Sequence, residues 1–149
     1  MVAGRDAGDD GVMRPLGRAA DAGGQAPVSG YLRALVDRDP AMMAQVLAPG
    51  AELRALIPPG LRQASGADQA AALVLGWFAD ASAVELRDSD AIVIGPRTRL
   101  RYRLRVTEGD DVYDVEQVAY FTLGADRILA ADLLCSGFHQ AAATENAAG

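Results

Sequence analysis

Lysine is absent from this sequence of 149 residues, and all fourteen basic side chains are arginines. Chemistry that forms a Schiff base on a protein lysine is therefore excluded. Twenty acidic residues outnumber the arginines and give a net charge of −6. Nucleic acids and anionic membrane surfaces are polyanions that a negatively charged protein repels. We therefore expect neither nucleic acid nor membrane among its partners.

Cysteine and histidine each occur once, as Cys135 and His139. A single cysteine cannot close an intrachain disulfide, which excludes the disulfide framework typical of small secreted proteins. Two soft ligands are too few for a structural zinc site, and we expect neither a metal nor a cofactor. On an extended strand the two residues would lie about 13 Å apart, so a nucleophile and base pair is not expected.

Long apolar runs are missing as well. No segment approaches the roughly 20 apolar residues of a membrane-spanning helix, and the first residues lack the apolar core of a secretion signal. These absences favour a cytoplasmic protein. Half of the residues are hydrophobic, which at this length suits one domain with a core. We assign this domain to residues 28–139 and predict disordered tails at residues 1–27 and 140–149.

Helical spacing of apolar residues predicts three helices in the first half of the domain. The first covers about residues 28–37 and places Tyr31 and Leu35 on one face. The second begins with Asp39 as N-cap and Pro40 at its first position, and Pro49 ends it. A short strand at residues 51–57 and a turn or loop follow. The third helix starts from a capping-box-like sequence at residues 65–68 and reaches about residue 80.

The apolar period changes to two from Val84 onward, which predicts a run of strands. The candidate strands are residues 84–94, 98–106, 113–123 and 127–138. The short glycine- and aspartate-containing breaks between them indicate antiparallel hairpins. Helices followed by a meander of strands predict an α+β fold, with the helices packed on one face of a strongly curved sheet.

Alternation within the strands predicts which side chains face inward. Arginines alternate with Leu100, Tyr102 and neighbouring apolar residues, so Tyr102 should face the interior while the arginines face solvent. On the following strand Gln117 shares a face with apolar residues. The outward arginines are expected to pair with outward acidic residues, among them Asp114, Glu116 and Asp132.

The last strand offers two faces. One is wholly apolar and consists of Leu129, Ala131, Leu133 and Cys135; the other carries Asp132. We assign the apolar face to the interior, although a bulge could invert this choice. Cys135 is then interpreted as a small buried residue rather than as a reactive thiol.

Residues 31–39 (YLRALVDRD), 46–53 (VLAPGAEL) and 126–128 (DRI), in this order of elements, resemble the nuclear-transport-factor-2-like (NTF2-like) superfamily. The nearer branches are the SnoaL-like polyketide cyclases and the ketosteroid-isomerase-like proteins. The resemblance covers about residues 28–139. It implies a cone, in which a curved antiparallel sheet wraps around about three helices and leaves an apolar pocket suited to flat hydrophobic ligands. We also expect a homodimer.

The resemblance implies roles for individual positions. Tyr31 lies where ketosteroid-isomerase-like proteins place a tyrosine that donates a hydrogen bond to a developing enolate oxygen. Ala55 occupies the position of their catalytic aspartate and cannot abstract a proton. Gln117 replaces their second oxyanion donor, and its amide can donate without being protonated. Asp132 is the carboxylate nearest to the final-strand position used by the cyclases and by limonene-epoxide hydrolases, one residue too early.

The candidate catalytic residues are therefore Tyr31, Gln117 and Asp132. Candidate substrate-binding residues are Tyr102, Trp77, Phe78, Ala55, Leu133 and Cys135. Each has a structural alternative: Tyr31 as a half-buried helical tyrosine, Gln117 as a partner for buried backbone groups, and Trp77 and Phe78 as core residues.

Two functions stay open. The first is a cofactor-independent cyclase, isomerase or epoxide hydrolase that acts on a hydrophobic, carbonyl- or epoxide-bearing small molecule. The second is a non-catalytic ligand-binding or dimerisation module of the same fold. The lack of a carboxylate on every inferred inner face supports the second, whereas an inward Asp132 would supply the first with a base. Whether the protein is an enzyme is thus left open.

Overall fold

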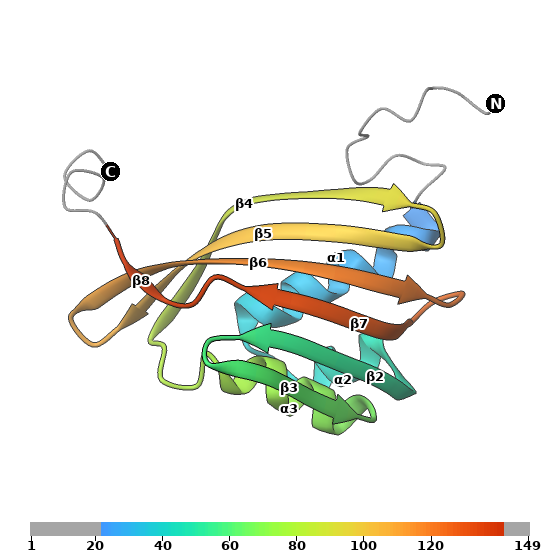
Figure 1. The fold of residues 1–149 in the computed structure, drawn as a ribbon, viewed down its shortest axis with the longest axis horizontal. Coiled ribbons are helices and arrows are strands. Elements are labelled where there is room, and N and C mark those ends of the chain that lie inside the picture. The colour runs from blue at the N-terminus through green and yellow to red at the C-terminus, as the bar shows by residue number, and fades with distance from the viewer. Residues whose placement is uncertain (1–21, 142–149) are drawn as a thin grey trace.

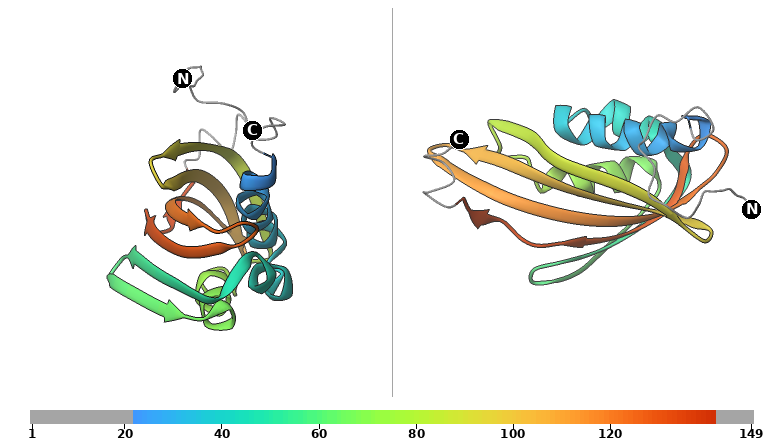
Figure 2. Two further views of the ribbon diagram at one scale, coloured as in Figure 1. Left: turned by 90° about the vertical axis from the view of Figure 1, so that its right-hand side faces the viewer. Right: turned by 90° about the horizontal axis from the view of Figure 1, so that it is seen from above.

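The computed structural model describes residues 22–141, so most of both predicted tails lies outside the described residues. Its elements are α1 (Ala22–Asp37), α2 (Pro40–Val46), β2 (Leu47–Ile57), β3 (Gly60–Ser65), α3 (Ala67–Gly76), β4 (Ala83–Ile94), β5 (Arg97–Glu108), β6 (Asp111–Leu123), β7 (Ile128–Cys135) and β8 (His139–Gln140). The helices lie on the concave side of a curved sheet (Figures 1 and 2). The predicted α+β cone is confirmed. Within the described residues, no helix has the length and apolar character needed to cross a membrane.

The strands follow the order β3-β2-β7-β6-β5-β4, and β8 pairs with β6. All neighbouring strands run antiparallel except β2 and β7, which are parallel. The sheet is therefore mixed, whereas the sequence predicted a wholly antiparallel one. Parallel neighbours need a long connection, and β2 and β7 are separated by β3, α3 and the three strands β4 to β6.

Three helix boundaries differ from the prediction. Helix α1 begins at Ala22 rather than near residue 28 and continues through Pro27. Strand β2 begins at Leu47, so α2 ends earlier than expected. The N-cap of α3 is Gly66 without a side-chain cap, because the Ser65 hydroxyl donates to Glu52 instead; the predicted capping box is wrong. Asp39 does cap α2, accepting from the backbone N–H of Met42 at 3.1 Å.

Strand β3 was not predicted, because its residues are mostly exposed and show no alternation.

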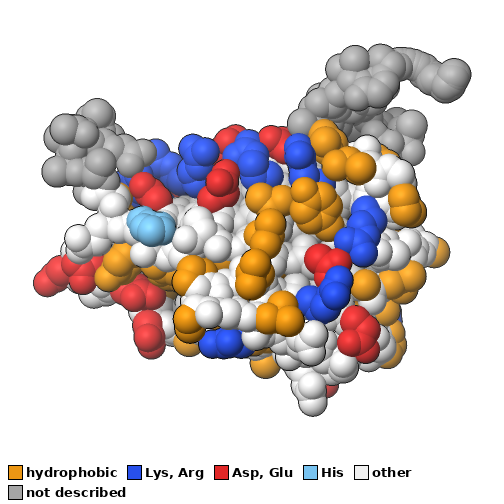
Figure 3. All heavy atoms as spheres, viewed as in Figure 1, with side chains coloured by type: hydrophobic (Ala, Val, Ile, Leu, Met, Phe, Trp, Pro, Cys, Tyr) orange, Lys and Arg blue, Asp and Glu red, His pale blue; other side chains and the backbone are white. Residues whose placement is uncertain are grey.

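The alternation of β5 is fully confirmed: Leu100, Tyr102, Leu104 and Val106 are completely buried. The outward arginines of β5 contact acidic side chains of β4 and β6. Arg101 contacts Asp88, Asp90 and Glu116, and Arg105 contacts Asp114. Figure 3 shows these charges along one side of the convex face.

A bulge changes the faces of β7. Thr122 pairs with Ala130 while the next residue of β6, Leu123, pairs with Ile128, so Leu129 has no partner on β6. Ile128 is therefore fully buried and Leu129 is 45% exposed. The predicted inward position of Leu129 is wrong, because a bulge re-aims side chains at one point of a strand. Ala131 and Leu133, beyond the bulge, are buried as predicted.

Candidate functional site

A row of polar side chains crosses the otherwise apolar interior. Tyr102 on β5 lies opposite Gln117 on β6, and Gln117 lies opposite Cys135 on β7. Directly opposite residues of antiparallel strands share a face, so the sheet register alone aligns these three side chains. Tyr31 reaches this row from α1. Val28, Ala34 and Leu35, three or four residues from Tyr31 on the same helix, are completely buried.

Hydrogen bonds join the row into a chain. The hydroxyl oxygens of Tyr31 and Tyr102 are 2.7 Å apart. Tyr102 donates to Gln117 Oε1 at 2.5 Å, and Gln117 Nε2 donates to Cys135 Sγ at 3.3 Å. The backbone N–H of Gly137 also donates to Cys135 Sγ, at 3.4 Å. We call Tyr31, Tyr102, Gln117 and Cys135 the buried polar chain.

The two tyrosines lie in an apolar, aromatic environment. Tyr31 is 2% exposed, and Tyr102 and Gln117 are completely buried. The Tyr31 ring packs edge-on against Tyr102 and Phe121, with ring centroids 5.9 and 5.0 Å apart. Burial raises the pKa of both phenols above their ordinary value. Both hydroxyls therefore keep their protons at neutral pH.

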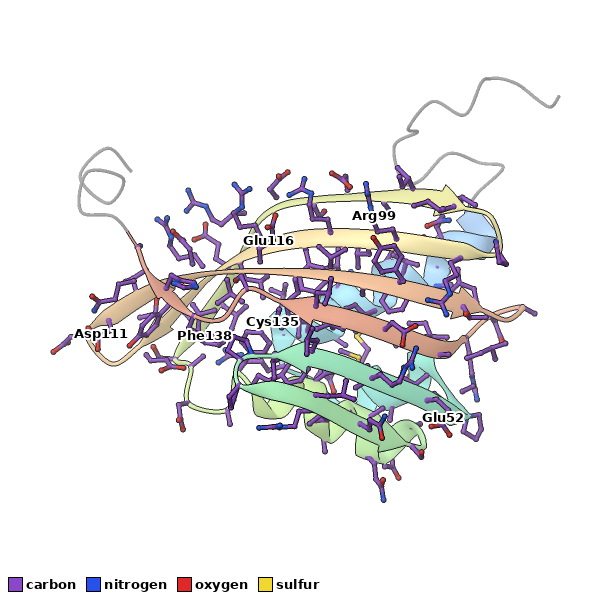
Figure 4. All side chains as sticks on the ribbon, in the orientation of Figure 1. Glu52, Arg99, Asp111, Glu116, Cys135 and Phe138 are labelled. Atoms are coloured by element: carbon purple, nitrogen blue, oxygen red, sulfur yellow. The ribbon has the colours of Figure 1, made fainter. Side chains whose placement is uncertain are left out.

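An aromatic cluster closes the interior next to Cys135. The segment after β7 carries Phe138, whose ring packs against Phe78 and Tyr113 with centroids 5.6 and 5.9 Å apart. Figure 4 shows Phe138 beyond Cys135, between the end of β7 and β8. Phe78 is completely buried and Phe138 is partly exposed. Phe138 is thus an outer member of this closure, together with the partly buried Tyr113.

The remaining predicted binding residues occupy the core. Ala55 and Leu133 are direct partners on β2 and β7, and both are buried. Their row of the sheet is next to that of Gln117, since Leu133 pairs with Ala119 on β6. Trp77, at the C-cap of α3, is only partly buried.

Asp132 lies on the opposite face of the sheet from the buried polar chain. Its two carboxylate oxygens accept hydrogen bonds from Arg54 and Arg97, each at 2.8 Å. The hydrogen bond from Arg54 is the largest influence on the pKa of Asp132; together with the bond from Arg97 it outweighs the opposing effect of burial, so the pKa is lowered. A base held between two guanidinium groups on the convex face has no access to the interior, so the structure does not bring Asp132 together with Tyr31 and Gln117.

Carboxylates are absent from the described interior. Gln25, Thr98 and Gln117 are the buried polar residues among those described, and every described aspartate and glutamate is at least partly exposed. Within the same part of the chain, no three His, Cys, Asp or Glu side chains form a group that could hold a metal ion.

Sequence reasoning did not name Phe121 and Phe138 as site residues. Phe121 could have been found, because it shares the inward parity of Gln117 on the same strand. Phe138 could not, because the chain leaves the regular strand at Ser136 and Gly137 adopts a φ of 87°. Parity cannot be extrapolated through such a break.

No protein-family model and no curated protein matches the sequence. Solved structures do match. An LEH-like epoxide hydrolase of Mycobacterium tuberculosis has a TM-score of 0.59 at 14% identity, covering 74% of this chain and 80% of that one. A ketosteroid-isomerase-like protein of Catenulispora acidiphila in complex with trimethylamine has a TM-score of 0.59 at 12% identity, covering 72% and 82%.

A third match is assigned as a SnoaL-like polyketide cyclase of Jannaschia sp. CCS1, with a TM-score of 0.56 at 18% identity, covering 75% of this chain and 86% of that one. The TM-scores of 0.56–0.59 establish a common fold, whereas identities this low leave the activity open. The fold implied by the sequence resemblance is thereby confirmed: this chain has the NTF2-like fold, shared with SnoaL-like polyketide cyclases, ketosteroid-isomerase-like proteins and LEH-like epoxide hydrolases.

Proposed function

We propose that this protein binds a hydrophobic small molecule inside the cone and uses the buried polar chain to orient it. The observation that carries the proposal is the chain itself: two tyrosines and a glutamine hydrogen-bonded in a row at 0–2% exposure. A core that only has to pack does not need such a row, because burying polar groups is costly unless each is satisfied. Apolar walls with a few convergent polar groups are typical of ligand sites.

Binding is favoured over catalysis. Cyclisation, isomerisation and epoxide hydrolysis without a cofactor need a positioned acid or base within hydrogen-bond reach of the reacting atom. The interior formed by the described residues offers neutral phenols, an amide and a thiol, and no carboxylate. Asp132, which would have supplied a base had it pointed inward, is held by Arg54 and Arg97 on the other face.

Entry of a ligand requires the aromatic closure to open, and Phe138 is the ring best placed to move. We expect N-phenyl-1-naphthylamine, whose fluorescence rises in apolar sites, to bind saturably with one site per chain. Phe138→Ala should raise the association rate about tenfold, because one ring of the closure is gone. Stopped-flow fluorescence measures both quantities.

The matched control for this experiment is Val93→Ala, which removes methyl groups from a side chain that is 64% exposed on β4. It should leave the association rate unchanged. A linear, unsaturable signal for both wild type and Phe138→Ala would contradict the proposal. Conversion of an aromatic ketone or epoxide by the wild-type protein would show that it is an enzyme instead.

We further propose that the partner is a second copy of this chain, docked on the convex face. Leu56, Leu61 and Leu134 lie in one row across β3, β2 and β7 and are 49–57% exposed. With Tyr120 and Arg54 they line a groove of about 310 Å³. The groove also contains Asp132, whose carboxylate is paired with Arg54 of the same chain, so these two groups bring no unpaired charge into a two-fold contact of the patch with itself. Hydrophobic side chains gather in the middle of this face (Figure 3).

Leu56→Asp should convert a dimer into a monomer, because each two-fold contact would then bury two unpaired carboxylates. Sedimentation equilibrium at micromolar concentration measures the change. Val93→Asp, which adds the same charge at an exposed position of β4 outside the leucine row, should leave the dimer intact. A wild-type protein that is monomeric at 100 micromolar would rule out the interface.

A further inference from the structure

The shortest distance in the buried polar chain determines the direction of its hydrogen bonds. Tyr102 Oη and the facing amide atom of Gln117 are 2.5 Å apart. This separation fits an O–H···O bond, whereas N–H···O bonds are about 2.7–3.2 Å long. The amide therefore presents its oxygen to Tyr102, and an amide oxygen can only accept. Tyr102 is the donor.

The direction then propagates to Tyr31. A phenol has one proton to donate, and Tyr102 uses it for Gln117. The 2.7 Å bond between the two hydroxyls must therefore be donated by Tyr31. At the other end, the amide nitrogen of Gln117 donates to Cys135 Sγ. Both phenolic protons and one amide proton of Gln117 are thereby committed within the chain.

The Tyr31 end of the chain is consequently an acceptor. No donor among the described residues reaches the hydroxyl oxygen of Tyr31, whose lone pairs are free, while its only proton points at Tyr102. A ligand oxygen without a proton, such as a carbonyl or ether oxygen, could form no hydrogen bond with the Tyr31 hydroxyl, because the Tyr31 proton is already donated to Tyr102. A ligand that carries its own O–H or N–H would complete the chain.

We propose that the interior site selects a hydrophobic alcohol or phenol, which donates its hydroxyl proton to Tyr31. This inference rests on the proposed ligand-binding function and names the ligand class. It replaces the carbonyl or epoxide group expected from the sequence, because both of those groups only accept hydrogen bonds. A neutral hydroxyl is chosen over an ammonium group, since no described carboxylate is buried that could compensate a buried cation.

The opposite direction, with Tyr31 donating to a ligand oxygen as in the resemblance to ketosteroid isomerases, would require the whole chain to reverse. The amide nitrogen of Gln117 would then have to approach Tyr102 to 2.5 Å, and Cys135 would have to donate to the amide oxygen. The first contact is too short for N–H···O and the second uses a weak donor.

Three ligands with one aromatic skeleton test the inference: 2-naphthol, 2-methoxynaphthalene and 2-acetylnaphthalene. Competition with N-phenyl-1-naphthylamine at pH 7 gives their dissociation constants. One neutral hydrogen bond corresponds to about 3- to 10-fold in affinity, so 2-naphthol should bind better than the ether and the ketone by that factor. Tyr31→Phe should abolish the preference, and Val93→Ala, at an exposed side chain of β4, should retain it.

Tyr102→Phe provides a second, opposite effect. It frees the proton of Tyr31, so 2-acetylnaphthalene should gain affinity relative to 2-naphthol. Equal binding of the three ligands to the wild type, or a preference for the ketone, would overturn the inference and leave the proposed function standing. No binding of any of the ligands or of the fluorescent probe would overturn both. The wild-type comparison decides the matter even if a variant fails to fold.

Discussion

Replacing Phe121 with alanine should lower the free energy of unfolding by about 3–5 kcal/mol, the usual range for truncating a buried phenylalanine. Phe121 is completely buried on β6 and lies between its direct partners Thr98 and Ala131. Both partners are small, so neither can fill the cavity. Urea denaturation followed by tryptophan fluorescence of Trp77 measures the change, with the slope against denaturant unchanged.

The control for Phe121→Ala is Leu129→Ala, at a side chain that the bulge turns 45% outward. Its effect should stay within about 0.5 kcal/mol, as for surface substitutions in general. Comparable losses for the two variants would contradict the assignment of faces on β6 and β7. The Phe121 variant should also loosen Tyr31, whose ring centroid is 5.0 Å from that of Phe121.

Gln117→Leu should lower the free energy of unfolding by about 1–3 kcal/mol, the cost of leaving a buried donor without an acceptor. The leucine side chain fills a similar volume, so the loss reports hydrogen bonding more than packing. The orphaned group is the hydroxyl of Tyr102, which donates to Gln117 in the wild type and is completely buried.

A triple variant separates this explanation from a packing defect. In Tyr31→Phe/Tyr102→Phe/Gln117→Leu both phenols and the amide are replaced by apolar groups, and replacing both partners of a bond is close to neutral. Tyr31 is included because its hydroxyl bonds with that of Tyr102 and would otherwise lose this partner. The triple variant should therefore be more stable than Gln117→Leu alone, although it carries two more substitutions. Losses that simply add would show that the hydrogen bonds of Tyr31, Tyr102 and Gln117 are not coupled in the core.

Much of the site could be predicted from the sequence because strand parity is a local property. Alternation along β5 and β6 predicted that Tyr102 and Gln117 face the interior and that the arginines of β5 face solvent, and the structure agrees on both. The register that sets Tyr102 opposite Gln117 follows from the short hairpin between the two strands. The helical position of Tyr31 followed from apolar spacing in the same way.

Prediction failed where the chain departs from a regular period or where distant segments meet. The bulge at Leu129 inverted the faces of Ile128 and Leu129 on β7, and after the break at Gly137 the ring of Phe138 packs in the aromatic closure. Strand β3 is too exposed to alternate, and the parallel pairing of β2 with β7 joins segments far apart in sequence.

The sequence by itself determined the element types, the inward set of side chains on the regular strands and the shortage of chemical groups: no lysine, one cysteine and one histidine. Only the tertiary structure decided that Tyr31, Tyr102, Gln117 and Cys135 form one hydrogen-bonded row, and that Asp132 is held by two arginines on the other face. Periodicity reports to which side of its own strand a residue points. Hydrogen-bond direction and ion pairing depend on distances of a few ångströms between elements, which only the packed chain fixes.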